Sequence, residues 1–592
     1  MIEQNLKEKI SAAFKSLYNI ELGKEKITLE PTSPDYDGDF TFVVFPYLKQ
    51  SRKGPEQTAN DIGNFIKENL EEVESFNVIK GFLNFSLSHN FWFHFLEKNY
   101  SNKKFGFVSQ PTEQKILVEY SSPNTNKPLH LGHIRNNLLG YSVAQILKAN
   151  GHHVSMCNLV NDRGIHICKS MLAWMKSGND ETPESSGMKG DHLVGKYYVE
   201  FDKLYKSQIT KLVSEGMNEE EAEKKAPAII EAQELLQKWE RGDAETIRIW
   251  KMMNDWVYAG FDISYKKLGV TFDKYYYESN TYLLGKEIVQ EGLSKDVFYK
   301  KDDGSVWIDL TDDGLDHKLL LRGDGTSVYI TQDIGTAELK YKDFGCERSV
   351  YVVGNEQDYH FKVLKLICKK LGKSYADGIY HLSYGMVELP QGKMKSREGT
   401  VVDADDLIDE MILTAKETTN ALGKTEGLEE SELSELYDTV GMGALKYFLL
   451  KVDPKRKMLF NPAESIDFQG NTGPFIQYTH ARICSILRNA NAQNISFDPQ
   501  KMQMKKLEKE VLGILYKYPV VIANSGNELN PGVIANYVYE LAKSFNHFYH
   551  EHSIIKENNT DQKYFRIMIC MFTANVIRSG FGLMGIKVPE RM

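Results

Sequence analysis

The sequence predicts an α/β protein built around a parallel sheet. Three observations lead to this fold class. Strand, loop, helix and strand patterns follow one another within residues 115–160; residues 170–270 are long, charged and helical; and nearly everything after residue 402 has helical periodicity. At 592 residues the chain has room for about four domains. We therefore expect a parallel-sheet domain with a helical insertion, an N-terminal α+β domain and a C-terminal all-α bundle.

The first 108 residues have the pattern of a small α+β domain. Helical periodicity covers residues 3–19 and 56–72, and strand-like runs occupy residues 40–48 and 81–88.

A βαβ unit opens the main domain. The buried-strand run KILVEY (115–120) precedes the loop SSPNTNKPLH, a helix with an apolar stripe that ends at Gly151, and a second strand at 152–160. This unit is typical of a Rossmann-like sheet, whose ligand lies at the carboxyl end of the strand and the N-terminus of the helix.

Strand-like sequence resumes after the helical insertion. Residues 297–313, with turn-like DDG triplets, residues 327–332 (SVYITQ) and residues 349–355 (SVYVVGN) are predicted as strands. A calcium loop would need an alternation of ligands that the aspartates of this region lack.

The charge distribution permits a polyanionic partner. The net charge is −9, but from Lys451 onward 18 Lys and Arg stand against 12 Asp and Glu, an excess of +6 that leaves −15 on residues 1–450. A Lys-rich solvated surface would give the same excess.

The six cysteines form no CxxC pair, and no run approaches the roughly 18 apolar residues of a membrane helix. We expect a cytoplasmic protein without disulfides or a membrane segment.

The tetrad from His130 to His133, HLGH, stands where the βαβ unit would place a phosphate. Its two imidazoles are one helical turn apart, and Gly132 allows close approach of a ligand. Two solvated histidines are one alternative, and a zinc site is another, although no further ligand lies at a motif spacing nearby. Phosphate chemistry is favoured, and we expect no metal-ligating residues.

A second basic element, GKMKSREGT, occupies residues 392–400 before an acidic helix start. A loop of this kind can bring cations to a polyphosphate in its transition state, although a Lys-rich surface turn has the same composition. The segments LGKS (371–374) and LGKT (422–425) lack the earlier glycine that a P-loop needs.

Together these motifs resemble those of the class I aminoacyl-tRNA synthetases, and within them the arginyl enzymes. The resemblance runs nearly end to end and rests on SSPNTNKP, HLGH, KMKSR, GDHLVGKYYV, RGDGTSVYITQD, YVVGNEQDYHF, NTGPFIQYTHAR and LMGIKVPERM. It implies that ATP, with Mg²⁺, adenylates L-arginine and that the arginyl group passes to the 3′ end of tRNA(Arg).

For ATP, the resemblance implies that the two imidazoles act as the α-phosphate becomes pentacovalent. The implied catalytic residues are His130, His133, Lys127 and Lys393, and the implied ATP-binding residues are His130, Gly132, His133, His360, Lys393, Met394 and Ser396.

For L-arginine, a planar cation with five donors, a selective pocket needs carboxylates and an aromatic or hydroxyl neighbour. The resemblance places Glu278, Tyr329 and Asp333 at the guanidinium, and Asn124 and Gln357 at the backbone groups of the amino acid.

The chain departs from the family pattern at two places. Ser396 stands where the class motif KMSKS has its second lysine; many arginyl enzymes share this lack and use a lysine just ahead of HxGH, here Lys127. Arg163 follows Asp162 where tryptophan is usual, which leaves the pocket wall and the role of Asp162 open.

The resemblance also assigns domains and partners. Residues 1–108 would contact the tRNA elbow, residues 109–400 would form the catalytic domain, residues 401–450 would link it to the next part, and residues 451–592 would hold the anticodon.

Tyr478 and Met592 are the candidate anticodon contacts, and the aromatic segment FNHFYHEH could stack bases or belong to the core. A monomer is expected, and tRNA is expected to bind before arginine is activated.

Three other functions fit part of the pattern. A class I synthetase for another amino acid would differ in YVVGNEQDYHF and QYTHAR. An inactive tRNA-binding paralogue would not need an intact HLGH and Lys127. A small-molecule nucleotidyltransferase would leave the helical, basic C-terminus without a role.

Overall fold

The computed structural model describes residues 2–33, 35–388, 402–421, 423, 427–490 and 495–592. The chain divides into two compact units. The smaller contains Met1–Phe105, Arg482–Tyr518 and Glu540–Ile577, and the larger contains Gly106–Ala481, Pro519–Tyr539 and Arg578–Met592. Among the described residues, four helices contribute residues to both units: α19 (Gly473–Ala490), α21 (Tyr518–Glu528), α22 (Gly532–Glu551) and α23 (Thr560–Leu583).

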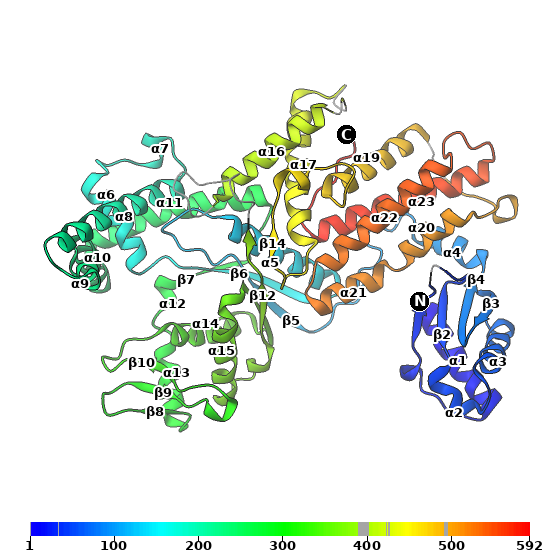
Figure 1. Cartoon of the computed structure of the whole chain (residues 1–592), viewed down its shortest axis with the longest axis horizontal. Helices are drawn as coiled ribbons and strands as arrows, with labels where there is room; N and C mark the ends of the chain where they lie inside the picture. Colours follow the sequence, from blue (N-terminus) through cyan, green and yellow to red (C-terminus); the bar gives the residue numbers. More distant parts are fainter. Residues whose placement is uncertain (1, 34, 389–401, 422, 424–426, 491–494) are drawn as a thin grey trace. The chain divides into compact units, whose positions relative to one another are not determined.

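Five parallel strands form the sheet of the larger unit, in the order β12-β11-β5-β6-β7 (Figure 1). Strand order reverses at β5, since β6 and β7 lie on one side of it and β11 and β12 on the other. This reversal is the topological switch point of a Rossmann-like sheet, and the predicted fold class is confirmed. The strands are β5 (Lys115–Glu119), β6 (His153–Val160), β7 (Lys274–Tyr277), β11 (Arg348–Gly354) and β12 (Ile379–Tyr384).

Helix α5 (Leu131–Ala149) connects β5 to β6 and packs against β5, β6 and β11. Its apolar stripe, which includes Ile134 and Leu138, is buried. The helix approaches the end of β5 closely at Gly140, where an added Cβ would lie 2.4 Å from Cβ of Tyr120. Glycine at this position therefore sets the distance between the helix and the strand.

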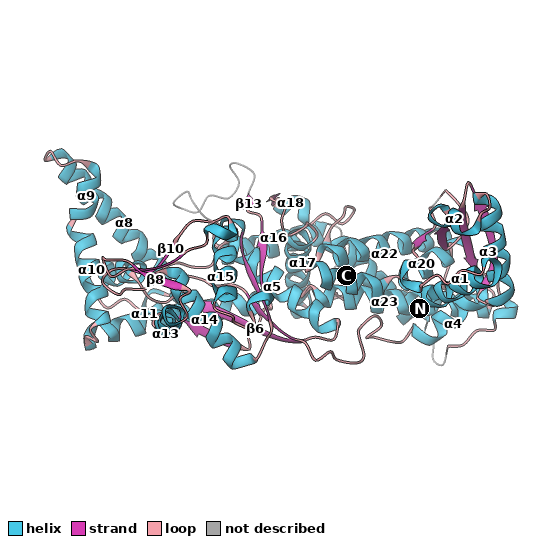
Figure 2. Ribbon diagram, turned by 90° about the horizontal axis from the view of Figure 1, so that it is seen from below, coloured by secondary structure: helices cyan, strands magenta, loops and turns pink. Residues whose placement is uncertain are grey.

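The chain between β6 and β7 forms the predicted helical insertion, which Figure 2 shows as a group of helices. Helix α8 packs against α6 and α11 within it. The helices are α6 (Ile165–Ser177), α7 (Pro183–Ser186), α8 (Gly190–Ser214), α9 (Glu219–Lys225), α10 (Pro227–Glu240) and α11 (Ala244–Leu268).

Between β7 and β12 the chain adds a small antiparallel sheet, of order β10-β9-β8, and four helices. The strands are β8 (Phe298–Lys300), β9 (Val306–Ile308) and β10 (Lys318–Leu321), and the helices are α12 (Glu278–Thr281), α13 (Gly285–Ser294), α14 (Tyr329–Phe344) and α15 (Asp358–Lys370).

The strand predicted at residues 327–332 is wrong, because most of this segment is the first turn of α14. Its residues favour strands locally, but Ile330, Ile334 and Ala337 share one face of a helix and are buried in one core cluster. Tertiary packing outweighs the local preference here.

The predicted helical periodicity after residue 402 is confirmed, with one short parallel pair of strands, β13 (Val387–Glu388) and β14 (Met458–Leu459). The remaining helices are α16 (Ala404–Ala421), α17 (Glu430–Leu450), α18 (Pro462–Ser465), α20 (Lys506–Tyr516) and α21 (Tyr518–Glu528).

The smaller unit contains an antiparallel sheet of order β1-β2-β4-β3, as the α+β pattern predicted. Trp92 and Phe95 of α4 pack their rings against Tyr516 of α20. Its N-terminal elements are α1 (Ile2–Tyr18), β1 (Leu29–Pro31), β2 (Phe40–Val43), α2 (Leu48–Ser51), α3 (Pro55–Asn69), β3 (Val73–Ile79), β4 (Phe82–Leu87) and α4 (His89–Asn99).

We predict that Gly140→Ala lowers the apparent melting temperature of the full chain. The new methyl group would overlap the Tyr120 side chain, and overpacking of this kind costs about 1 to 3 kcal/mol. The matched control is Gly582→Ala, because no atom lies within 4 Å of the added Cβ there. Calorimetry that shows equal melting temperatures for both variants would contradict the close approach of α5.

Candidate active site

The carboxyl edge of the parallel sheet carries the candidate site. His130 lies in the loop after β5, Glu278 directly follows β7, and Gln357 follows β11. Helix α14 leads into β11, so its N-terminus, with Asp333, lies at the same edge, because such helices run antiparallel to the strands. Topology thus gathers residues from four separate segments.

His130 and His133 cap the N-terminus of α5. The backbone N–H of Gly132 donates to Nδ1 of His130 (3.1 Å), and the backbone N–H of His130 donates to Nδ1 of His133 (3.2 Å). The ring centroids are 3.9 Å apart. Because each Nδ1 accepts, a neutral ring carries its proton on Nε2. Both Nε2–H groups are therefore available as donors to a ligand.

Burial keeps both imidazoles neutral. It lowers the pKa of His130 to about 4, with the charge of Lys127 as a second cause. The pKa of His133 lies well below its usual value because of burial, then His130 and Lys127. At neutral pH the site offers two uncharged donors whose positions are set by the backbone.

Lys127 supplies a fixed positive charge beside the imidazoles. Burial lowers the pKa of this lysine, and none of the described carboxylates forms an ion pair with it. Helix α8 supports the loop closely, since a Cβ on Gly195 would lie 2.9 Å from Cδ of Pro128. The ammonium group is partly desolvated and available to a phosphate.

Three predicted ATP-binding residues, Lys393, Met394 and Ser396, lie outside the described residues. The segment after them pairs with the start of α5, where the backbone N–H of Leu131 donates to the carbonyl of Val402 (3.0 Å). The residues that follow 389–401 are thus hydrogen-bonded to α5 beside the imidazoles.

Arg135 holds the segment that precedes residues 389–401 against α5. Its side chain is 2% exposed, and its guanidinium donates to the carbonyl oxygens of Gly385 (2.6 Å), Pro454 (3.2 Å) and Arg456 (3.0 Å). The first two turns of α5 therefore carry the imidazoles and also hold the segments on either side of residues 389–401.

A polar cluster joins α8 to the start of α16. Asp405 accepts hydrogen bonds from Lys189 (2.5 Å) and Ser264 (3.1 Å), and its carboxylate lies 3.2 Å from Nε2 of His192. Burial opposes ionisation, but the bonds from His192 and Lys189 lower the pKa of Asp405. Asp191, His192 and Asp405 could ligate a metal ion, yet the Lys189 ammonium already contacts both carboxylates. The cluster is better described as an ion-pair network.

Asp162 positions the first turn of α12. Its carboxylate accepts from the backbone N–H (2.8 Å) and hydroxyl (2.7 Å) of Ser279 and from the hydroxyl of Tyr258 (2.9 Å). Burial raises the pKa of Asp162. Because Ser279 follows Glu278, these bonds fix the backbone that carries the predicted guanidinium ligand.

Glu278 has a pKa raised to about 7, chiefly by burial; Arg163 lowers this pKa, and Asp333 and Asp162 raise it. Arg163, which stands where the family pattern has tryptophan, forms an ion pair with Glu240 (2.7 Å). Its guanidinium lies 3.9 Å from the ring centroid of Tyr282. A stacked cation thus replaces an aromatic ring and partly offsets the acidic charge.

Asp333 and His360 are brought together, with His360 Nε2 2.6 Å from a carboxylate oxygen of Asp333. One was predicted to bind arginine and the other ATP. Tyr329 is 74% exposed, and Asn124 and Gln357 are also exposed at the sheet edge. The structure therefore leaves the Tyr329 ring mainly in solvent.

The C-terminal segment lies against α19, the helix that carries Tyr478. Gln477 donates to the carbonyl of Lys587 (2.8 Å), and Nδ1 of His480 lies 2.9 Å from the carbonyl of Pro589. These contacts bring the end of the chain, with Met592, to the same helix.

Sequence reasoning missed the positioning roles of Arg135 and Asp405, and it left that of Asp162 open. It also missed Asn136, which donates to the carbonyl of Val352 (2.7 Å) and so ties α5 to β11. The available signal was the run of polar residues, Arg135 and Asn136, on a helix that is otherwise largely apolar. Arg135 donates to carbonyls 250 and 321 residues away, and Asn136 donates to a carbonyl 216 residues away, so sequence spacing could not identify these partners.

A Rossmann-like sheet with an HLGH pair at its switch point is typical of the class I aminoacyl-tRNA synthetases. The family description "tRNA synthetases class I (R), catalytic domain" matches residues 96–461, "Arginyl tRNA synthetase N terminal domain" matches residues 4–87, and "DALR anticodon binding domain" matches residues 476–592. The chain belongs to the arginyl-tRNA synthetase family, and the predicted resemblance is confirmed.

Relatives match over the full length. The arginine-tRNA ligases of Bacteroides thetaiotaomicron and Flavobacterium psychrophilum are 56% and 55% identical to this chain, and each alignment covers 100% of both proteins. The solved structure of Thermus thermophilus arginyl-tRNA synthetase has a TM-score of 0.80 at 23% identity, with 100% of both chains covered, so the fold is shared.

We predict that His130→Asn makes the protein less sensitive to acid. Between the ordinary histidine pKa of 6.5 and the folded value of about 4, the unfolded chain binds a proton at His130 that the folded chain does not, so stability falls as pH falls. Asparagine still caps the helix but does not titrate. The melting temperature should therefore fall less between pH 7 and pH 5 in the variant.

The exposed His153 provides the control, because His153→Asn should leave the acid sensitivity of the melting temperature unchanged. Equal acid sensitivity of His130→Asn and wild type would show that the imidazole is not held neutral by burial.

Proposed function

We propose that the chain is an arginine-tRNA ligase, which activates L-arginine with ATP to arginyl-adenylate and transfers the arginyl group to the 3′ end of tRNA(Arg). One observation carries the proposal: two neutral imidazoles, whose Nε2–H groups have no hydrogen-bond partner among the described residues, stand at the switch point of the sheet, and Glu278 and Asp333 lie at the same edge.

In the activation step a carboxylate oxygen of arginine attacks the α-phosphorus of ATP, and the bond to pyrophosphate breaks. Negative charge grows on the oxygens of the pentacovalent phosphorus. His130 and His133 would donate to these oxygens from Nε2, and their backbone-held rings need little reorganisation to do so. Lys127 and Lys393 would offset the charge of the departing pyrophosphate.

The remaining proposed ATP contacts come from Gly132 and His360, and from Met394 and Ser396 outside the described residues. Mg²⁺ would enter with ATP. The groups around His130 are imidazole nitrogens and an ammonium, whereas Mg²⁺ prefers oxygen ligands and is commonly held by substrate phosphates. We therefore propose no resident Mg²⁺ site in the described residues.

Arginine recognition would depend on Glu278 and Asp333, the acidic edge of the sheet. Glu278, with a pKa of about 7, is only partly ionised before the substrate binds. An entering guanidinium favours the ionised form and pairs with it in a bidentate geometry. Asp333 would provide the second carboxylate, and Tyr329 would close over the guanidinium. Asn124 and Gln357 would hold the amino and carboxylate groups.

A neutral amino acid is a poor alternative substrate, because it would leave Arg163 as the cation that offsets the charge of the half-buried Glu278 and would add no second one. Lysine carries a compact charge that cannot form the bidentate pair. The acidic edge thus favours arginine over other substrates of class I synthetases.

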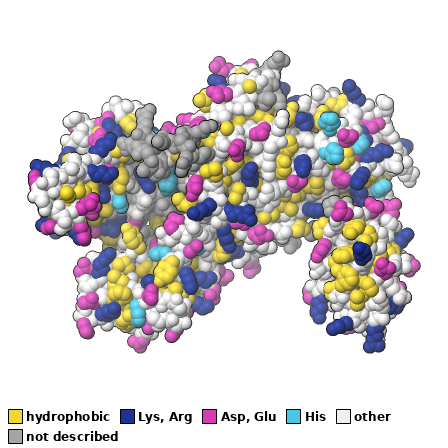
Figure 3. Space-filling view, in the orientation of Figure 1, with side chains coloured by type: hydrophobic (Ala, Val, Ile, Leu, Met, Phe, Trp, Pro, Cys, Tyr) yellow, Lys and Arg dark blue, Asp and Glu magenta, His cyan; other side chains and the backbone are white. Residues whose placement is uncertain are grey.

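For tRNA, we propose that residues 1–108 contact the elbow and residues 451–592 hold the anticodon, with Tyr478 and Met592 as contacts. Basic and acidic side chains are interspersed on the face shown in Figure 3, and histidine side chains gather over the C-terminal helices. In FNHFYHEH both phenylalanines are fully buried, while Tyr549 is 38% exposed. Tyr549 is therefore the aromatic residue of this segment that could stack a base.

We further propose a cytoplasmic monomer that activates arginine only with tRNA bound, in which residues 109–400 form the catalytic domain and residues 401–450 link it to the anticodon-binding part. In the described residues, no helix has both the length and the apolar character of a membrane span.

Arginine-dependent exchange of pyrophosphate into ATP, with and without tRNA, tests the function. Wild type should exchange with arginine and not with the other nineteen amino acids, and should need tRNA. Glu278→Gln should lower kcat/KM for arginine by about 10- to 100-fold, since a hydrogen bond to a charged group contributes about 1.5 to 3 kcal/mol.

The exposed Glu287 provides the control, because Glu287→Gln should retain wild-type kinetics. No exchange in either condition, or a preference for another amino acid, would contradict the proposal.

We predict that Asp162→Asn raises KM for arginine more than KM for ATP. An amide cannot accept hydrogen bonds from the N–H and hydroxyl of Ser279 and from Tyr258 as the carboxylate does, so Glu278 would lose its position. Tyr258→Phe removes one of the three bonds and should have a smaller effect. Steady-state kinetics in which both KM values change equally would show that Asp162 does not act through Glu278.

A further inference from the structure

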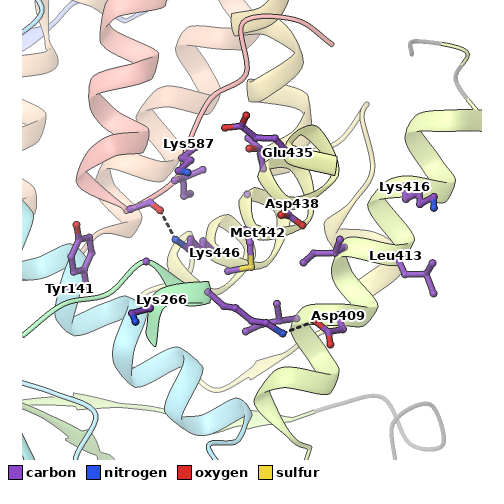
Figure 4. A pocket seen from close by; sticks show the side chains of 18 of the residues that line it. Tyr141, Lys266, Asp409, Leu413, Lys416, Glu435, Asp438, Met442, Lys446 and Lys587 are labelled. Carbon is purple, nitrogen blue, oxygen red and sulfur yellow. Dashed lines mark hydrogen bonds and ion pairs between the residues drawn. The ribbon is translucent and has the colours of Figure 1, made fainter. Parts of the chain in front are cut away.

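A cavity lies in the larger unit, away from the catalytic edge. It has a volume of about 940 Å³ and is enclosed by α5, α11, α16, α17 and residues 582–587 (Figure 4). Tyr141, which lines it, is eleven residues beyond His130 on α5, or about 16 Å along the helix axis. The cavity therefore differs from the site that holds the imidazoles.

A buried cation lies in the wall of this cavity. Lys446 of α17 is 6% exposed, and its ammonium donates to the carbonyl of Gly585 (2.6 Å). None of the described carboxylates pairs with it, and burial followed by the charge of Lys587 lowers its pKa to about 8. An ammonium has three protons, so this lysine keeps donor capacity for an anion.

Two more lysines lie on the side of the cavity that holds Lys446. Figure 4 shows Lys266 and Lys587, both exposed, on the side of the cavity that also holds Lys446 and Tyr141. A Cβ on Gly585 would lie 3.1 Å from the Tyr141 ring and 3.8 Å from Nζ of Lys446, so these groups converge on one small region. Three ammonium groups and a phenol suit a phosphate.

The rest of the lining has a different character. Met442, Ile412 and Leu413 give an apolar surface, and Leu413 is 55% exposed. The lining also contains carboxylates: Asp409 is paired with Lys267 (3.0 Å), Asp438 has a pKa raised by burial, and Glu435 lies beside Lys587 (Figure 4). Apolar surface accommodates a base, and carboxylates accept hydrogen bonds from ribose hydroxyls and exocyclic amines.

We propose that this cavity binds a nucleoside phosphate, with the phosphate on Lys446, Lys266 and Lys587 and the base over Met442. The volume lies within the roughly 300 to 1,000 Å³ of small-molecule sites. The ligand is either a free nucleotide or a nucleotide of bound tRNA, because the same chemistry recognises both. Helices α5 and α16 both begin at the catalytic edge and continue to this cavity, so its occupant contacts elements of both sites.

Calorimetric titration of the full chain with the four nucleoside 5′-monophosphates tests the proposal. At least one should bind, and its parent nucleoside should bind at least about tenfold more weakly. Lys266→Ala and Lys587→Ala should each weaken binding about tenfold, because each removes a charged hydrogen bond. Lys251→Ala, an exposed lysine of α11 outside the cavity, is the matched control and should bind as wild type does.

Competition with tRNA distinguishes the two sources. Two results would assign the cavity to a nucleotide of tRNA. One is displacement of the mononucleotide by tRNA; the other is weaker tRNA binding in Lys266→Ala and Lys587→Ala, the two rim variants, but not in Lys251→Ala. Simultaneous binding of tRNA and mononucleotide assigns it to a free nucleotide.

Because the rim lysines are exposed, their variants should fold even if Lys446→Met does not. Unchanged mononucleotide binding and unchanged tRNA binding in both rim variants would overturn the proposal. The exchange assay is scored separately, so this result leaves the proposed ligase activity unaffected.

Discussion

The buried polar side chains at the start of α5 are the constraint on which the catalytic geometry depends. Asn136 accepts from the backbone N–H of Ser121 (2.6 Å) and donates to the carbonyl of Val352 (2.7 Å), while Arg135 binds carbonyl oxygens on two further segments. A buried guanidinium or amide that loses its acceptors is strongly destabilising. The helix therefore has one favourable position, and the imidazoles at its N-terminus are placed relative to β5, β11 and the flanks of residues 389–401.

Desolvation lowers the pKa of the two imidazoles and raises the pKa of Glu278. At the start of α5 it makes the imidazoles neutral, so that they donate hydrogen bonds without adding charge. Beside α12 it raises the pKa of Glu278 to about 7, so that the carboxylate ionises fully only when a cation arrives. The same physical cause thus gives neutral hydrogen-bond donors at one part of the sheet edge and a carboxylate of raised pKa at another.

Sequence periodicity predicted β5, α5 and β6 because the apolar patterns of these elements are local. It failed at residues 327–332, where Val, Tyr, Ile and Thr favour strands one by one but the buried stripe has helical spacing. It also missed Arg135, one of whose acceptors is 321 residues away, and it left Asp162 open, whose partner Ser279 is 117 residues away. Pattern reasoning finds elements and motifs, whereas hydrogen-bond partners across the fold require the structure.

The sequence by itself determined the chemical groups and their places at strand and helix ends: an HLGH tetrad after a buried strand, a lysine just ahead of it, and acidic residues in matching segments. Only the tertiary structure decided which of these groups share an edge, which tautomer each imidazole adopts, and that Lys189 forms ion pairs with both Asp191 and Asp405. The reason is that ionisation and hydrogen bonding depend on burial and on charges brought close by long-range folding, and local sequence encodes neither.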